Sequence, residues 1–186
     1  MIPSTSCLAT IVLSLRDKSH SPFRSASHYL SAYEVTPGGI DRLILCNTSS
    51  YLGPADQWDD RIASVLKADP AETAEMFLRN WFPPALLEAD GSVVTKIRAM
   101  LLATNPQGFA GSYAAIRDMD MRRTVALIAC PTLVIAGQYD TVTLPSHSEL
   151  IAATVPGAKL VVLPVVHLSN LESPDIFMKA VLDFLL

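Results

Sequence analysis

The sequence is short of charge, of cysteine and of long hydrophobic runs, and each shortage narrows what the protein can be. A net charge of −4 over 186 residues provides no basic surface, so we expect no nucleic-acid partner. No apolar stretch approaches the roughly 20 residues of a membrane-spanning helix, so we expect no membrane partner. The three cysteines, Cys7, Cys46 and Cys130, lack the spacing of a metal site and are typical of reduced thiols. We therefore predict a cytoplasmic protein without a bound metal.

The composition favours one globular domain preceded by an unusual segment. Half of the residues are hydrophobic and 17% are charged, which is enough for a sizeable core. Residues 1–36 are rich in serine and show neither the helical nor the strand period, so we predict that they are atypical and poorly structured. We assign residues 37–50 and 121–186 to the core of the domain, and residues 51–120 to a helical segment.

The segment 51–120 has the pattern of several short helices. Good helix formers dominate it, and breaks occur at residues 69–70, 83–84, 90–91 and 105–106, where proline or glycine follows aspartate, asparagine or proline. Most of its bulky apolar surface comes from seven side chains, which are Trp58, Phe77, Trp81, Phe82, Met100, Phe109 and Tyr113.

The core segments alternate between strand and helix patterns. A β-type run at 42–48 precedes the helices, and after them come strands at 131–137 and 159–163, each followed by a helix, near 145–154 and at 174–185. This alternation predicts an α/β fold with parallel strands and right-handed crossovers. Ser173 is placed to cap the last helix. The residues of that helix that we expect to face the sheet are Ile176, Phe177, Ala180, Val181, Phe184 and Leu185.

An acid and a histidine follow the last two strands. Asp140 comes just after the strand at 131–137, and His167 just after the run that begins at Lys159. Because chemistry in parallel sheets occurs at the carboxyl ends of the strands, we predict that the two side chains meet there. Acid before histidine is the order of the second half of a Ser–Asp–His triad. The alternatives are a structural histidine bonded to a backbone carbonyl, and an exposed or helix-capping aspartate.

The nucleophile of such a triad is not identifiable in the sequence. No Gly-x-Ser-x-Gly segment occurs anywhere in the chain. The pair Ser49-Ser50 follows a strand but lacks flanking glycines, and Cys46 lies within the strand, where packing is its expected role. The pair Gly38-Gly39 is too short to indicate an oxyanion hole. The nucleophile stays unknown at this stage.

The aromatic residues of the helical segment have two interpretations. They can simply pack the helices together, or they can form a lid over a pocket, with Trp81 as a substrate-binding residue that excludes water. In the same segment Arg79 and Arg98 can attract a substrate carboxylate, or they can be ordinary solvated charges on helices.

Familiar sequence occurs in five segments, at residues 40–48, 79–82, 97–106, 131–140 and 167–172. Together they resemble the 3-oxoadipate enol-lactonases of the α/β-hydrolase superfamily, over residues 40–186. The resemblance implies a partial α/β-hydrolase fold, with the last three parallel strands and their helices plus an all-helical lid at 51–120. It implies a small-molecule lactone substrate, opened to 3-oxoadipate during bacterial breakdown of protocatechuate and catechol, without a cofactor. It also implies that Asp140 and His167 are the triad acid and base.

The departures from this family are as informative as the resemblance. Family members carry further strands and the nucleophile elbow before this region, whereas here only residues 29–34 loosely echo the helix that follows the elbow. We therefore expect a truncated or frame-disrupted gene and an inactive fragment, which can self-associate through an open sheet edge. The alternatives are another lidded α/β-hydrolase, acting on esters or carbon–carbon bonds, and a non-enzymatic remnant or interaction module.

Overall fold

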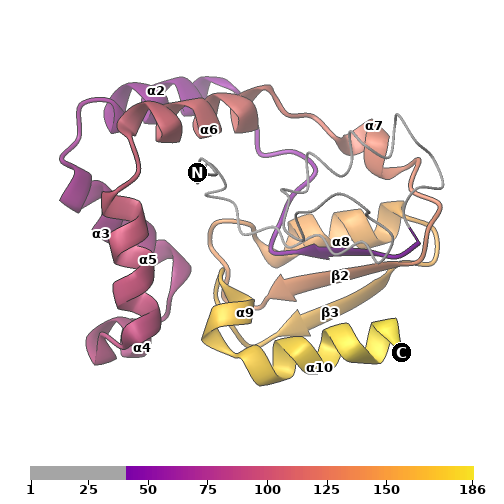
Figure 1. Ribbon diagram of the computed structural model, residues 1–186. Helices are drawn as coiled ribbons and strands as arrows, with labels where there is room; N and C mark the ends of the chain where they lie inside the picture. Colours follow the sequence, from indigo (N-terminus) through magenta and orange to yellow (C-terminus); the bar gives the residue numbers. More distant parts are fainter. Residues whose placement is uncertain (1–40) are drawn as a thin grey trace. The chain divides into compact units, whose positions relative to one another are not determined.

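The computed structural model describes residues 41–186, which form two compact units (Figure 1). One unit contains residues 51–119, and the other contains residues 41–50 and 120–186. The atypical segment predicted at 1–36, Cys7, the helix echo at 29–34 and the pair Gly38-Gly39 all lie outside the described residues. The two units are described separately below.

The unit at 51–119 is entirely helical, as the sequence predicted. Its helices begin and end at the predicted breaks because proline and the cap residues lie there: the side chain of Asp69 accepts a hydrogen bond from the Ala71 amide, and that of Asn105 accepts one from the Gln107 amide. In Figure 1, α2 lies beside α6 and α3 beside α5. The helices are α2 (Asp56–Val65), α3 (Pro70–Trp81), α4 (Pro84–Ala89), α5 (Ser92–Leu102) and α6 (Pro106–Asp118).

Aromatic side chains form much of the core of this helical unit. The ring of Phe77 lies at the centre of the cluster, 5.0 Å from the ring of Trp81 and 5.1 Å from that of Phe109. Six of the seven bulky apolar residues singled out from the sequence are buried, whereas Met100 is 40% exposed. Met100 lies one residue before the buried Leu101, which takes the inward position on α5.

The second unit is a three-stranded parallel sheet with helices on both faces. The strands are β1 (Leu43–Cys46), β2 (Thr132–Gly137) and β3 (Lys159–Leu163), in the order β1-β2-β3. The predicted parallel pairing is confirmed, with Ile44 opposite Leu133 and Ile135 opposite Val161. The helices of this unit are α7 (Arg122–Val125), α8 (Pro145–Thr154), α9 (Ser169–Glu172) and α10 (Pro174–Leu185). The sequence did not predict α7 and α9, because four residues are too few for a helical period.

Two apolar cores cover the faces of the sheet. One joins alternate strand residues to α7 and α8, and the other joins the remaining strand residues to α10. Figure 1 shows α8 and α10 on opposite sides of the sheet. Burial on both faces explains why β1 and β2 are apolar without alternation, whereas β3 is exposed at Lys159, Leu160 and Val162. The first core contains Leu43, Leu45, Val125, Ile128, Val134, Ile151 and Val155. The second contains Ile44, Cys46, Leu133, Ile135, Leu163, Val165, Phe177, Val181 and Phe184.

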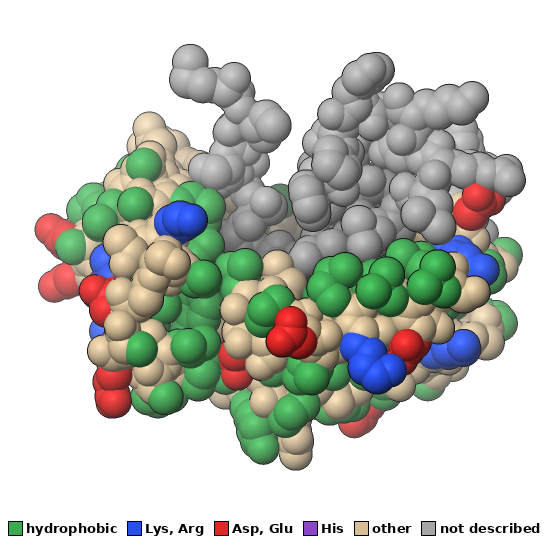
Figure 2. Space-filling view, turned by 60° about the horizontal axis from the view of Figure 1, so that its bottom comes forward, with side chains coloured by type: hydrophobic (Ala, Val, Ile, Leu, Met, Phe, Trp, Pro, Cys, Tyr) green, Lys and Arg blue, Asp and Glu red, His purple; other side chains and the backbone are tan. Residues whose placement is uncertain are grey.

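Two predictions for α10 are wrong in detail. Ile176 is 38% exposed and lines an open groove of about 350 Å³ between β3 and α10, because Phe177, Val181 and Phe184 occupy the face that meets the sheet. The side chain of Ser173 makes no capping hydrogen bond, since its backbone (φ −141°, ψ 71°) also ends α9. Figure 2, in which the bottom of Figure 1 comes forward, shows hydrophobic side chains in green among charged ones in blue and red.

β1 lies at one end of the described sheet. Among residues 41–186 its one strand partner is β2, and the side chains of Leu43–Cys46 are at most 2% exposed. Self-association through an open edge stays a prediction. Within the same range no helix is long and apolar enough to cross a membrane.

Candidate active site

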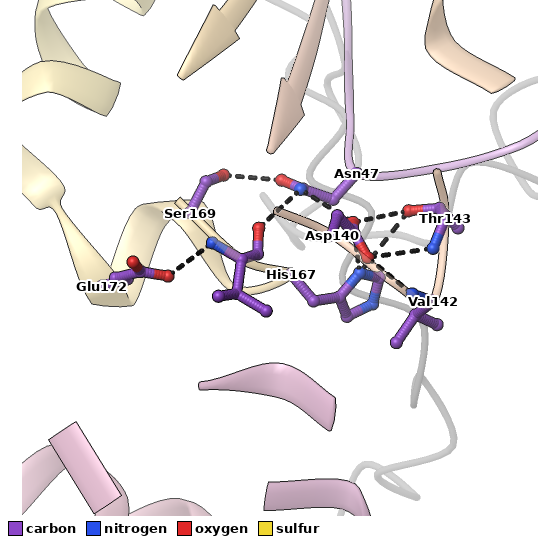
Figure 3. A network of polar contacts seen from close by, with 8 residues as sticks. Asn47, Asp140, Val142, Thr143, His167, Ser169 and Glu172 are labelled. Atoms are coloured by element: carbon purple, nitrogen blue, oxygen red, sulfur yellow. Dashed lines mark hydrogen bonds and ion pairs between the residues drawn. The ribbon is translucent and has the colours of Figure 1, made fainter. Parts of the chain in front are cut away.

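The predicted acid and histidine lie together at the carboxyl ends of β2 and β3 (Figure 3). His167 Nδ1 is 2.8 Å from Asp140 Oδ2. Both residues are buried, with exposed fractions of 0% for His167 and 2% for Asp140. The structure therefore shows a direct contact between a buried aspartate and a buried histidine, from two loops that are 27 residues apart in sequence.

The carboxylate of Asp140 accepts hydrogen bonds from several further donors. Oδ1 accepts from the backbone amides of Val142 at 2.8 Å and Thr143 at 2.9 Å. Oδ2 accepts from the Thr143 hydroxyl at 2.8 Å and from Asn47 Nδ2 at 3.1 Å. Burial by itself raises the pKa of Asp140, but the hydrogen bonds from His167 and Thr143 outweigh it and hold that pKa below its ordinary value. Asp140 is therefore an ionised carboxylate at neutral pH.

We expect this lowered pKa to make the fold sensitive to acid. A carboxyl whose pKa is lower in the folded state stabilises that state above its unfolded pKa of about 3.9, and the stabilisation disappears as the pH falls through the folded pKa. At pH 7, Asp140→Asn should lower the free energy of unfolding by about 1–3 kcal/mol. The difference from wild type should shrink as the pH falls below about 4. Urea unfolding at pH values between 2 and 7, monitored by amide hydrogen exchange in β2 and β3, measures this difference in the free energy of unfolding.

The matched control for this experiment is Asp60→Asn, because Asp60 is exposed on α2. The control should leave the pH dependence of β2 and β3 unchanged. A parallel pH dependence of wild type and Asp140→Asn would contradict the role given to the ionised carboxylate.

The backbone just before His167 is held by hydrogen bonds to the loop after β2 and to α9. Before the histidine, the amides of Gln138 and Tyr139 donate to the carbonyls of Leu163 and Val165, at 2.8 and 3.0 Å. Directly before it, the Val166 amide donates to Glu172 Oε2 at 2.7 Å. Burial raises the pKa of Glu172, and this hydrogen bond acts in the opposite direction. The side chain of Glu172 thus connects α9 to the residue just before the histidine.

The surroundings of His167 determine which ring nitrogen carries the proton. An ionised carboxylate only accepts hydrogen bonds, so we assign the hydrogen of the neutral ring to Nδ1, which faces Asp140. Nε2 is then the basic nitrogen. The arrangement suits a general base whose imidazolium form is stabilised by a fixed negative charge.

The other residues considered from the sequence occupy different positions. Cys46 is 2% exposed, and burial raises the pKa of its thiol far above its ordinary value, so the thiol is an inert packing group. Trp81 is 4% exposed in the core of the helical unit, and its substrate contact stays a prediction. Arg98 is already held by Glu75 at 2.7 Å and Asp90 at 2.6 Å, which satisfies its charge within its own unit. Over residues 41–186, no group of three or more histidine, cysteine, aspartate or glutamate side chains is placed to hold a metal ion.

Sequence reasoning missed four polar residues of this network: Asn47, Thr143, Ser169 and Glu172. A signal existed for Asn47, because it follows β1 directly and so lies at the same sheet edge as Asp140 and His167. Thr143 and Glu172 follow the acid and the histidine by three and five residues. Nothing in that spacing shows that their side chains turn back toward the loops.

Comparison with known proteins identifies the fold of most of the chain. No protein-family model matches the chain. A crystal structure of a hydrolase from Pseudomonas aeruginosa is 60% identical, with a TM-score of 0.79, over 84% of this chain and 59% of that one. The enol-lactonase from Burkholderia xenovorans is 32% identical, with a TM-score of 0.76, over 83% of this chain and 60% of that one. 3-Oxoadipate enol-lactonase 2 from Acinetobacter baylyi is 30% identical over 145 residues, which are 78% of this chain and 54% of that protein.

The described residues thus have a partial α/β-hydrolase fold, and the predicted fold class is confirmed. Within that superfamily, the resemblance of this chain to the carboxyl-terminal part of 3-oxoadipate enol-lactonases is also confirmed. The chain spans about half the length of the curated relatives that it matches.

Proposed function

We propose that this chain carries the acid–base half of a carboxylic ester hydrolase of the 3-oxoadipate enol-lactonase type. The observation that supports the proposal is the buried 2.8 Å hydrogen bond between Asp140 and His167 at the carboxyl ends of adjacent parallel strands. The likeness to enol-lactonases at 30% and 32% identity supports the lactone as substrate. On this proposal the protein acts in the cytoplasm, in the breakdown of aromatic compounds.

The chemistry assigns a separate task to each residue. Nε2 of His167 accepts the proton of a serine hydroxyl while the serine oxygen attacks the lactone carbonyl. The ring C–O bond then breaks, and the leaving enol oxygen receives that proton from Nε2. Nε2 then takes a proton from a water molecule while the water oxygen attacks the acyl-serine. The bond to the serine oxygen breaks, that oxygen receives the proton from Nε2, and the carboxylic acid is released. Asp140 keeps the Nδ1 hydrogen in place and stabilises the imidazolium during each transfer.

We expect the purified chain to show no detectable turnover of 3-oxoadipate enol-lactone. The sequence contains no Gly-x-Ser-x-Gly segment, so nothing in it resembles a nucleophile elbow for His167 to activate. The measurement is the loss of lactone absorbance, with an intact enol-lactonase at equal concentration as the positive control. Turnover that disappears in His167→Ala would contradict the expectation and would show an unconventional nucleophile.

A chimera tests whether the acid–base half is competent. The Pseudomonas aeruginosa hydrolase is 60% identical to this chain over their region of similarity. In the chimera, the part of that hydrolase that precedes this region is joined to residues 41–186 of this chain. We expect this protein to hydrolyse the lactone, whereas each part alone does not. A folded chimera without hydrolase activity would contradict the proposal.

The same chimera separates the proposal from its rivals. Hydrolysis of simple p-nitrophenyl esters without turnover of the lactone would favour an esterase. The relative at 60% identity, described only as a hydrolase, keeps this alternative open. Cleavage of carbon–carbon bonds in a diketone substrate would favour the third hydrolase class. A folded chimera that is inactive toward all three substrates would favour an interaction module. Sedimentation of the full chain would then detect self-association of that module.

A further inference from the structure

Asn47 occupies an unusual position at the end of β1. It is 1% exposed, and its φ of 45° lies in the left-handed region, which asparagine tolerates better than most residues. Its backbone amide still donates to the Ile135 carbonyl at 2.9 Å, so the residue is tied to the sheet. The left-handed turn directs the chain away at this point, while the side chain stays buried at the edge where Asp140 and His167 meet (Figure 3).

The carboxamide of Asn47 connects the ends of all three strands. Nδ2 donates to Asp140 Oδ2 at 3.1 Å, in the loop after β2, and lies 3.3 Å from the carbonyl oxygen of Val166, in the loop after β3. Oδ1 accepts from the Ser169 hydroxyl at 2.6 Å, at the start of α9. Two acceptors face the nitrogen and one donor faces the oxygen, so the orientation of the amide is determined by its partners.

These contacts coincide with the atoms that matter for the acid–histidine pair. Asp140 Oδ2 is the same oxygen that accepts from His167 Nδ1, and Val166 directly precedes the histidine. The Asn47 amide therefore holds both the acceptor oxygen and the backbone of the residue before the donor ring. Ser169 in turn holds the amide and lies two residues after the histidine.

We propose that Asn47 is a positioning residue that assembles the Asp140–His167 pair by donating to Asp140 Oδ2 and the Val166 carbonyl, with its amide locked by Ser169. The pair is thus organised within the described sheet unit, by residues of that unit. The catalytic meaning of this inference rests on the proposed function. The assembly itself does not, because it concerns the hydrogen bond between Asp140 and His167 in the chain as it exists.

The test follows the Nδ1 hydrogen of His167 by NMR on the ¹⁵N-labelled full chain. Wild type should show a slowly exchanging Nδ1–H signal that His167→Gln removes, which assigns it. Asn47→Asp keeps the shape of the side chain and tolerates the left-handed backbone, but replaces the donor with a carboxylate beside Asp140. Asn47→Gly keeps the backbone and removes the amide. Both should exchange this hydrogen at least about tenfold faster, or lose its signal, while the amides of β2 and β3 keep their protection.

The matched control is Asn80→Asp, which makes the same substitution at an exposed position on α3 and should leave the signal unchanged. If Asn47 merely fills space or forms the turn, Asn47→Asp would exchange like wild type, and that result overturns the proposal. Absence of the signal from the wild-type chain would also overturn it. Should neither Asn47 variant fold, Ser169→Ala decides: faster exchange supports the locked amide, and an unchanged rate contradicts it. An inactive chimera with these signals intact would refute the proposed function only.

Discussion

Replacing His167 with alanine in the active chimera is expected to lower kcat for the lactone by at least about 10⁴-fold. The reason is that Nε2 of this ring is the base for the serine proton, and the ring is held for that task by the 2.8 Å hydrogen bond from Nδ1 to Asp140. Asp140→Asn should lower kcat by a comparable factor, because an amide in place of the carboxylate favours the wrong tautomer of the ring. Single-turnover kinetics with each variant measure the chemical step directly.

A second histidine provides the control for this result. His147 lies on α8, and its Nδ1 makes no hydrogen bond within the described residues. The charge of Asp140 acts on His147, but the ring does not contact the reacting groups in this mechanism, so His147→Gln should retain most of the activity. Equal losses in His147→Gln and His167→Ala would mean that the assay reports folding and not catalysis. Activity of His167→Ala within tenfold of the parent chimera would contradict the assignment of the base.

Replacing Gly137 with alanine is expected to loosen the whole sheet edge. Gly137 is the last residue of β2, and a Cβ atom there would overlap the Val166 carbonyl oxygen, lie 2.7 Å from that of Val165 and 3.1 Å from Asn47 Nδ2. Two of these neighbours are backbone atoms of the histidine loop, so relief requires the loop itself to move. We expect the free energy of unfolding of the sheet unit to fall by about 3 kcal/mol.

Amide hydrogen exchange is the suitable measurement for this variant. Both tryptophans, Trp58 and Trp81, lie in the helical unit, so their fluorescence follows that unit and not the sheet. In Gly137→Ala, exchange of the β2 and β3 amides through unfolding should be at least about 100-fold faster, since 1.4 kcal/mol corresponds to a factor of ten. Protection within threefold of wild type would contradict the steric argument.

The control for Gly137→Ala is Gly111→Ala. Nothing lies within 4 Å of a Cβ atom at Gly111, which is inside α6. Alanine is the better helix former, so this variant should stabilise the helical unit by about 0.5–1 kcal/mol and leave the sheet amides unchanged. The same substitution thus has opposite expected signs at the two glycines.

Local signals in the sequence were sufficient for most of the secondary structure. Asp69 before Pro70 and Asn105 before Pro106 mark helix starts because a cap and a proline act on adjacent residues of the chain. The predicted strand at 159–163 agrees with β3, and the predicted helix at 174–185 agrees with α10. The prediction failed where packing against elements far along the chain decides burial, as for Ile176.

The sequence by itself determined that an acid and a histidine follow adjacent parallel strands, since strand patterns and their order are local properties. Only the tertiary structure decided how the pair is held. Asn47 reaches Asp140 across 93 residues and Ser169 across 122. Gly137 is required by the approach of the Val166 carbonyl from another loop. Such contacts depend on the register of β1, β2 and β3 and on the paths of the loops beyond them, which no local pattern specifies.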